Sequence, residues 1–135
     1  MPMLPSPAAA AVYGAIKVAG YGVYAAGLAK YGRSRVHPLV FGVAKTLLGL
    51  AAGIAFFSIL AAYLPPQTSD LLAWLVAIPI RLAVWLLALH LFFRFGQGWR
   101  VWLVAAVLGT VLSYALDGVM WLLYRVLPGM QMPWC

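Results

Sequence analysis

Residues 71–93 read LLAWLVAIPIRLAVWLLALHLFF, an apolar run that is interrupted by Pro79, Arg81 and His90. A helix needs about 20 mainly apolar residues to cross the roughly 30 Å hydrocarbon layer of a bilayer, and this run is long enough. A charged side chain inside such a helix is costly, and it usually pairs with another charge or lines a water-filled path. The run therefore predicts a membrane-spanning helix and raises the question of what neutralises Arg81.

The rest of the chain has the same character. Of its 135 residues, 66% are hydrophobic and only 8% are charged, whereas about a quarter of the residues in a soluble domain are charged. We predict spans at about residues 8–29, 39–64, 70–93 and 99–127. Because little sequence remains outside these spans, we expect residues 1–135 to form one transmembrane domain without a soluble module. The first span lacks the basic start of a signal peptide, so we expect it to be retained.

The connections between the spans predict the topology. KYGRSRVH at 30–37 and RFGQGWR at 94–100 are rich in Lys and Arg, whereas LPPQTSD at 64–70 has no base. Short cytoplasmic loops carry the excess of basic residues, which places both termini outside. Short loops also favour antiparallel neighbours. We therefore predict an all-α integral membrane four-helix bundle, multi-pass in a cell inner membrane or plasma membrane.

Depth along the helices predicts which intramembrane charges meet. At about 1.5 Å per residue, Lys17, Arg81 and Asp117 lie roughly 24–30 Å from their cytoplasmic turns, in one layer. We expect Arg81 to pair with Asp117 on the neighbouring helix, and Ser113, Tyr114 or a carbonyl freed by a proline to add hydrogen bonds. This pair could fix the helix register or bind a substrate, and the sequence leaves both open.

Lys45 and His90 lie nearer the cytoplasmic side. The count gives roughly 16 Å for Lys45 and roughly 10 Å for His90. We expect the Lys45 ammonium to snorkel toward the headgroups, and His90 to lie near the interface without binding a metal. Lys17 is deeper, so that snorkelling and a substrate role are both open for it.

The spans hold a surplus of positive charge. Lys17, Lys45 and Arg81 face one acid, Asp117, which leaves two bases without compensation. An anion would supply the missing charge, and a lipid phosphate, a phosphorylated polyprenol or an inorganic anion each fits this chemistry. The predicted substrate-binding residues are Lys17, Arg81, Asp117, Ser113, Lys45 and Tyr24.

Several classes of function are not expected. No nucleophile with a base at the same depth, carboxylate pair or metal-ligand cluster is found, so we propose no catalytic residue, metal or cofactor and expect no enzyme. The basic residues lie in short loops and spans and form no solvated face for nucleic acid. The chain has the size and span count of the small multidrug pumps, but it lacks the glutamate that those pumps carry in their first helix.

Two hypotheses for the function remain. In the first, the protein binds or helps translocate an anionic lipid or small anion. Four helices hardly enclose a wide path, so this requires a homo-oligomer or a larger partner, with residues 39–64 as a candidate contact. The pair of glycines in GLAAG at 49–53 permits close helix approach there. In the second hypothesis, the protein is a non-catalytic accessory, assembly or immunity-type subunit, and its bases pair with acids of a partner membrane protein.

Overall fold

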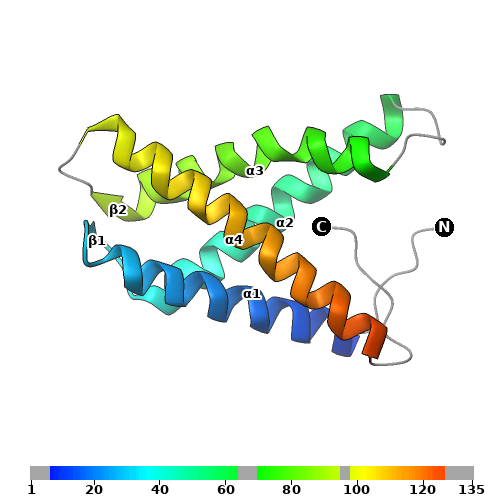
Figure 1. Ribbon diagram of the computed structural model, residues 1–135, viewed down its shortest axis with the longest axis horizontal. Coiled ribbons are helices and arrows are strands. Elements are labelled where there is room, and N and C mark those ends of the chain that lie inside the picture. The colour runs from blue at the N-terminus through cyan, green and yellow to red at the C-terminus, as the bar shows by residue number, and fades with distance from the viewer. Residues whose placement is uncertain (1–6, 64–69, 95–97, 127–135) are drawn as a thin grey trace.

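The computed structural model describes residues 7–63, 70–94 and 98–126, and this part of the chain is helical apart from short turns and one strand pair (Figure 1). Its elements are α1 (Pro7–Leu28), β1 (Arg33–Ser34), α2 (Pro38–Tyr63), α3 (Asp70–Phe92), β2 (Phe93–Arg94) and α4 (Trp99–Val126). The bounds of the four helices agree with those of the four predicted segments to within one residue at each end. The all-helical fold is confirmed.

Three of these helices contain stretches that are long and apolar enough to cross a bilayer: Pro38–Phe56 in α2, Leu75–Phe92 in α3 and Trp99–Leu123 in α4. This composition supports a protein embedded in a membrane. The fourth helix, α1, is not among them, because alanine, glycine and tyrosine make up much of its 22 residues and Lys17 lies near its middle.

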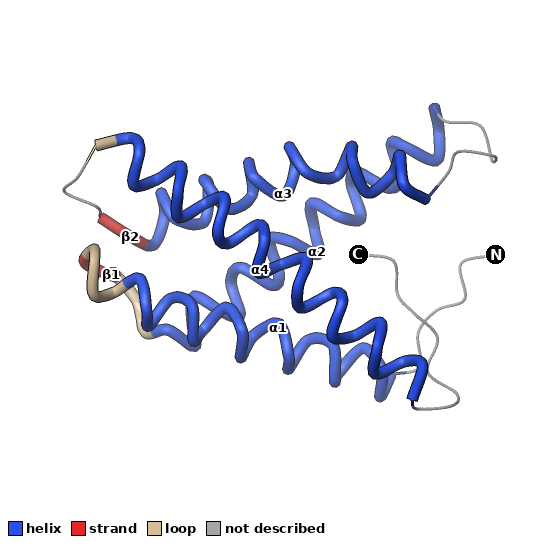
Figure 2. The backbone as a smooth tube through the Cα atoms, in the orientation of Figure 1, coloured by secondary structure: helices blue, strands red, loops and turns tan. Residues whose placement is uncertain are grey.

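Each helix packs against two others. α1 contacts α2 and α4, and α3 contacts the same two helices. In Figure 1, α1 and α3 lie along two sides, while α4 crosses diagonally in front and α2 crosses behind. The first turn of α1 and the last turn of α4 lie at one end, and the strands lie at the other (Figure 2).

The strands β1 and β2 join the two helix pairs at that second end. They run antiparallel, and Arg33 is paired with Arg94. The backbone N–H of Arg35 also donates to the carbonyl of Phe92 (2.8 Å), so the turn after α1 is held against the end of α3. This pairing was not predicted from the sequence.

Glycine brings α1 and α2 together at Gly42. A Cβ there would overlap the backbone carbonyl oxygen of Val18, so the two backbones touch without a side chain between them. The glycines of GLAAG behave differently. A Cβ at Gly53 would meet nothing within 4 Å, and one at Gly49 would meet only the Lys45 Nζ, at 3.7 Å. Among the described residues, these two glycines do not bring helices of this chain together, and the predicted contact of this segment with another copy or a partner stays a prediction.

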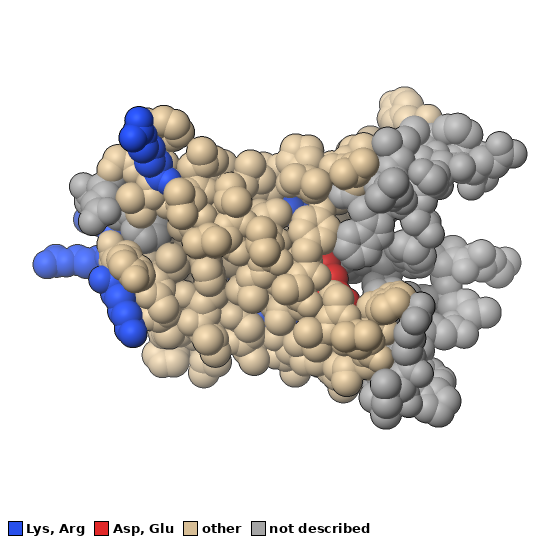
Figure 3. Space-filling view, in the orientation of Figure 1, with Lys and Arg blue, Asp and Glu red and all other residues tan. Residues whose placement is uncertain are grey.

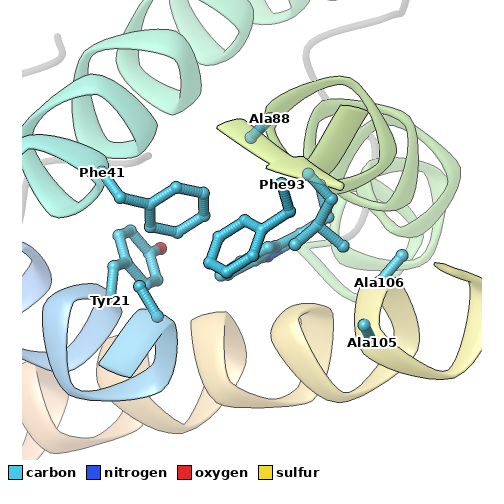
Figure 4. Close-up of a cluster of buried hydrophobic side chains, with 9 residues drawn as sticks. Tyr21, Phe41, Ala88, Phe93, Ala105 and Ala106 are labelled. Atoms are coloured by element: carbon cyan, nitrogen blue, oxygen red, sulfur yellow. The ribbon is translucent and has the colours of Figure 1, made fainter. Parts of the chain in front are cut away.

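An aromatic core fills the space between the helices. Trp85 of α3 is completely buried, and the ring centroids of Tyr21 and Phe41 lie 5.3 and 6.1 Å from its ring. Figure 4 shows Tyr21, Phe41 and Phe93 meeting in this cluster from α1, α2 and β2. Gly109 of α4 lies against the indole, since a Cβ there would come within 2.5 Å of its Cδ2.

Candidate functional site

Asp117 is the centre of a buried cluster of charges in the half of α4 farther from the strands. Its residue is only 4% exposed, and its Oδ2 lies 2.6 Å from Nη1 of Arg81. Its Oδ1 lies 2.7 Å from Nζ of Lys17 and accepts a hydrogen bond from the Tyr13 hydroxyl at 3.1 Å. The predicted pairing of Arg81 with Asp117 is confirmed. The further contacts matter because a buried ion pair is tolerated only when its remaining polar groups are satisfied.

Arg81 is positioned by two more side chains of α4. Its Nη1 donates to Oγ of Ser113 at 3.3 Å, and its guanidinium carbon lies 4.3 Å from the centroid of the Tyr114 ring. The Ser113 hydroxyl also hydrogen-bonds the Tyr21 hydroxyl of α1 (2.7 Å). Ser113 and Asp117 are four residues apart and therefore share a helix face. Three helices thus hold one polar network.

On α1 the spacing of four residues recurs. Tyr13, Lys17 and Tyr21 follow one another at this interval, so all three side chains lie on the same face. The Lys17 Nζ lies 4.7 Å from the centroid of the Tyr13 ring. Helical spacing from Lys17 already places Tyr13 on the same face, and the same spacing was the available signal for Tyr21, for which no role was predicted.

Lys45 does not snorkel, and that expectation is wrong. The residue is only 3% exposed, and its Nζ lies 5.0 Å from the ring centroid of Tyr21 and 4.6 Å from that of Trp85. The side of α2 that carries Lys45 therefore faces the interior, where two aromatic faces attract the ammonium. Among the described residues, Lys45 has no carboxylate partner.

The three bases line one cavity of about 80 Å³. The other residues around it are Tyr13, Tyr21, Thr46, Gly49, Leu50, Ala52, Gly53, Phe56, Ala77, Ile80, Val84 and Ser113. One water needs about 10–15 Å³ of such space, so the cavity has room for several waters or a small anion. Leu50 is 43% exposed, so the cavity reaches the outer surface of the helices along α2. Asp117 is not among the residues that line the cavity. The described residues of the cavity wall therefore include three bases and no acid.

Two residues named from the sequence lie elsewhere. The Tyr24 hydroxyl donates to the carbonyl of Ala105 at 2.6 Å, and Tyr24 is not among the residues around the cavity. His90 is exposed, and its ring centroid lies 5.7 Å from that of Trp102. The structure therefore brings together Lys17, Lys45, Arg81, Asp117 and Ser113, and it separates Tyr24 from them.

No protein-family model matches this chain, and no curated protein or solved structure is significantly similar to it. The geometry of the charged residues therefore carries the functional argument.

Proposed function

We propose that the protein binds a small anion, or the phosphate of an anionic lipid, in the cavity between its helices and helps to move it across the membrane. The observation that carries this proposal is the charge of the cavity wall. The cavity is lined by three bases, Lys17, Lys45 and Arg81. The carboxylate of Asp117, which does not line the cavity, contacts Lys17 and Arg81. Three positive charges against one negative charge leave a surplus of two.

The bases have different parts in this proposal. Lys17 and Arg81 are held by Asp117, so they form a fixed positive wall. Lys45 contacts two aromatic rings and faces the same cavity, so its three N–H groups are the natural donors to an incoming anion. An unpaired charge out of water is strongly disfavoured, and a bound anion would relieve that cost.

The dimensions of the cavity favour a ligand group no larger than an inorganic oxyanion. A space of about 80 Å³ holds a phosphate but not a lipid. If the anion belongs to a lipid, the acyl chains leave past Leu50 into the bilayer. We further propose that the four helices form an antiparallel bundle with both termini outside. On this topology the basic segments 30–37 and 94–100 are cytoplasmic. A translocation path needs a homo-oligomer or a partner, because four helices enclose little space.

A second candidate function has one observation in its favour. Where Leu50 lies, the cavity opens beside an exposed apolar face of α2 that includes Val43, Leu47 and Ile54. A helix of another membrane protein could pack there and supply a carboxylate to Lys45. The protein would then be an accessory or assembly subunit, and it would carry no substrate.

Replacement of Lys45 by methionine tests the proposal. We expect phosphate, compared with gluconate at equal ionic strength, to raise the melting temperature of the purified wild-type protein, because a ligand of the folded state stabilises it. Lys45→Met should abolish that rise and still fold, since methionine is unbranched and nearly as long as lysine. Arg100→Gln removes an exposed charge away from the cavity and should keep the rise.

Flux measurements complete this test. Vesicles containing the wild-type protein should release the stabilising anion faster than vesicles containing Lys45→Met. If the wild-type protein shows no anion-dependent stabilisation, the anion proposal is wrong. Loss of a co-purifying membrane protein in Lys45→Met, without any anion effect, would support the accessory-subunit function.

A further inference from the structure

A second cluster of basic residues lies at the end of the helices where the strands pair, away from the cavity. Arg33 of β1 and Arg94 of β2 are direct partners in the antiparallel pair, and both are exposed. Directly opposed residues of such a pair project from the same face, about 5 Å apart at Cβ, and like charges in these positions repel. In Figure 3 the Lys and Arg side chains that protrude from the surface lie at this end, and only small blue patches are visible elsewhere.

The part of the chain that the structure describes places no side-chain carboxylate close enough to offset this repulsion. The chain contains only two acidic residues, Asp70 and Asp117. Asp117 is occupied by Lys17 and Arg81 in the buried cluster. Asp70 begins α3, and the 23 residues of that helix place it roughly 35 Å from β2. Among the described residues, no negative charge balances the two strand arginines.

The two strand arginines belong to a shallow concave surface. We call it the basic concavity, and its residues are Ala29, Lys30, Tyr31, Gly32, Arg33, Ser34, Arg35, His90, Phe93, Arg94 and Trp102. Its volume of about 1020 Å³ far exceeds that of the inner cavity. Four of these residues carry a fixed positive charge.

One of the four bases has a structural role. The Arg35 backbone N–H and its Nη1 donate to the carbonyls of Phe92 (2.8 Å) and Leu91 (3.3 Å), at the end of α3. Basic side chains commonly satisfy the last carbonyls of a helix in this way. The side chains of Arg33 and Arg94 make no hydrogen bond or ion pair with the described residues, so they are free to bind.

The position of the basic concavity indicates the source of the ligand. It begins where α3, which is apolar enough to span a bilayer, ends at Phe92. Tyr31, 71% exposed, and Trp102 lie beside the arginines, and these two residue types concentrate at the headgroup level of membranes. Basic residues at this level attract the anionic lipids of the adjoining leaflet.

We propose that the basic concavity binds the headgroup of an anionic phospholipid, with Arg33 and Arg94 holding its phosphate. The planar guanidinium fork matches two phosphate oxygens, and two opposed forks can hold one phosphate between them. A lipid bound here would join the α1–α2 and α3–α4 pairs at their strand end. This site is separate from the cavity around Lys45 and does not depend on its function.

Native mass spectrometry of the detergent-purified protein tests this proposal, with phosphatidylglycerol and phosphatidylcholine as the lipid probes. The wild-type protein should retain phosphatidylglycerol at least tenfold better than phosphatidylcholine. Arg33→Gln and Arg94→Gln should each weaken the retention of phosphatidylglycerol several-fold. The matched control is Arg100→Gln, which removes the same charge from an exposed position outside the basic concavity and should change little.

A conservative variant distinguishes a specific binding site from a general attraction to the positive surface charge. Arg33→Lys combined with Arg94→Lys keeps every charge but removes the guanidinium forks, and it should also lose most of the preference for phosphatidylglycerol. Equal losses in Arg33→Gln, Arg94→Gln and Arg100→Gln would overturn the proposal and indicate diffuse attraction only. If millimolar inorganic phosphate displaced the lipid, the site would recognise a free phosphate rather than a lipid headgroup in particular, and the proposed preference for a lipid would be overturned.

The two proposed sites can be distinguished in one set of proteins. The strand variants should keep the Lys45-dependent rise in melting temperature with phosphate, and Lys45→Met should keep the preference for phosphatidylglycerol. If Arg33→Gln abolished both effects, the basic concavity would not be an independent site.

Discussion

Arg81 and Asp117 join α3 to α4 through a contact of 2.6 Å between Nη1 and Oδ2, and the same carboxylate holds Lys17 of α1 at 2.7 Å. One acid therefore offsets two bases from two other helices. This asymmetry predicts which residue of the cluster can be substituted with the smallest loss of stability.

Asp117→Asn should destabilise the protein more than Lys17→Met or Arg81→Met. The asparagine leaves two buried bases without a counter-charge, whereas each methionine variant leaves one ion pair intact. Breaking a buried pair by removing one partner costs about 3–5 kcal/mol. Reversible unfolding in mixed micelles gives the free energies of unfolding for this comparison.

A triple variant is the control for this order. Lys17→Met, Arg81→Met and Asp117→Asn together remove all three charges, so the triple variant should recover much of the stability that Asp117→Asn loses. If Arg81→Met proved as costly as Asp117→Asn, Lys17 would not be an effective second partner of the carboxylate.

The sequence predicts this cluster because two simple constraints act on it. A charge within a span needs a partner, and the number of residues from a turn gives the depth of each charge. The two constraints together leave Arg81 and Asp117 as the natural pair. The span boundaries can also be predicted from the sequence, since prolines, glycines and polar runs separate the apolar segments.

The placement of Lys45 and the pairing of the strands could not be predicted in this way. Depth along a helix does not say which side of the helix faces the interior, and the packed structure places the Lys45 ammonium against Tyr21 and Trp85. Strands of two residues are too short to show an alternating pattern, so Arg33 and Arg94 gave no signal. Both features depend on how helices cross, which is a property of the packed chain.

Gly109→Ala should destabilise the core. A Cβ at this position would come within 2.5–2.7 Å of three atoms of the Trp85 indole, which is fully buried and cannot move away. Overpacking of this kind costs about 1–3 kcal/mol. The melting temperature of the purified protein measures the effect.

Gly118→Ala is the matched control for that substitution, because it lies on the same helix and a Cβ there meets nothing within 4 Å. It should leave the melting temperature unchanged or raise it slightly, since alanine is the better helix former. An equal fall in the melting temperature of both variants would contradict the idea that Gly109 is needed for Trp85 to pack against α4.

Gly42→Ala should separate α1 from α2. The added methyl group would overlap the Val18 carbonyl oxygen, which belongs to the backbone and cannot rotate away. Small residues at such crossings allow helices to pack closely in membranes. We expect a loss of about 1–3 kcal/mol in the free energy of unfolding. Gly14→Ala on α1, where a Cβ meets nothing within 4 Å, should be neutral.

Tyr24→Phe tests whether Tyr24 has a substrate role. Its hydroxyl donates to the Ala105 carbonyl at 2.6 Å, so the variant should lose about 1 kcal/mol of stability, the usual net value of one hydrogen bond. Because Tyr24 does not line the cavity, phosphate should stabilise the variant as much as the wild-type protein. A weaker response to phosphate would assign Tyr24 to the anion site.

Gly53→Leu should close the inner cavity without disturbing the packing of the helices. Gly53 lines this cavity, and a Cβ there meets nothing within 4 Å, so a larger side chain has room only in the space that the anion would occupy or at its opening. We expect the phosphate-dependent rise in melting temperature to fall toward that of Lys45→Met. In the absence of phosphate, the melting temperature should be equal to or higher than that of the wild-type protein.

The control for this change is Gly118→Leu, which adds the same side chain at another open helical glycine, away from the cavity. It should keep the full response to phosphate. Because Gly53→Leu leaves all three bases in place, its effect separates occupation of the cavity from a general loss of positive charge. A full response to phosphate in Gly53→Leu would show that the anion binds elsewhere, even if Lys45→Met abolished that response.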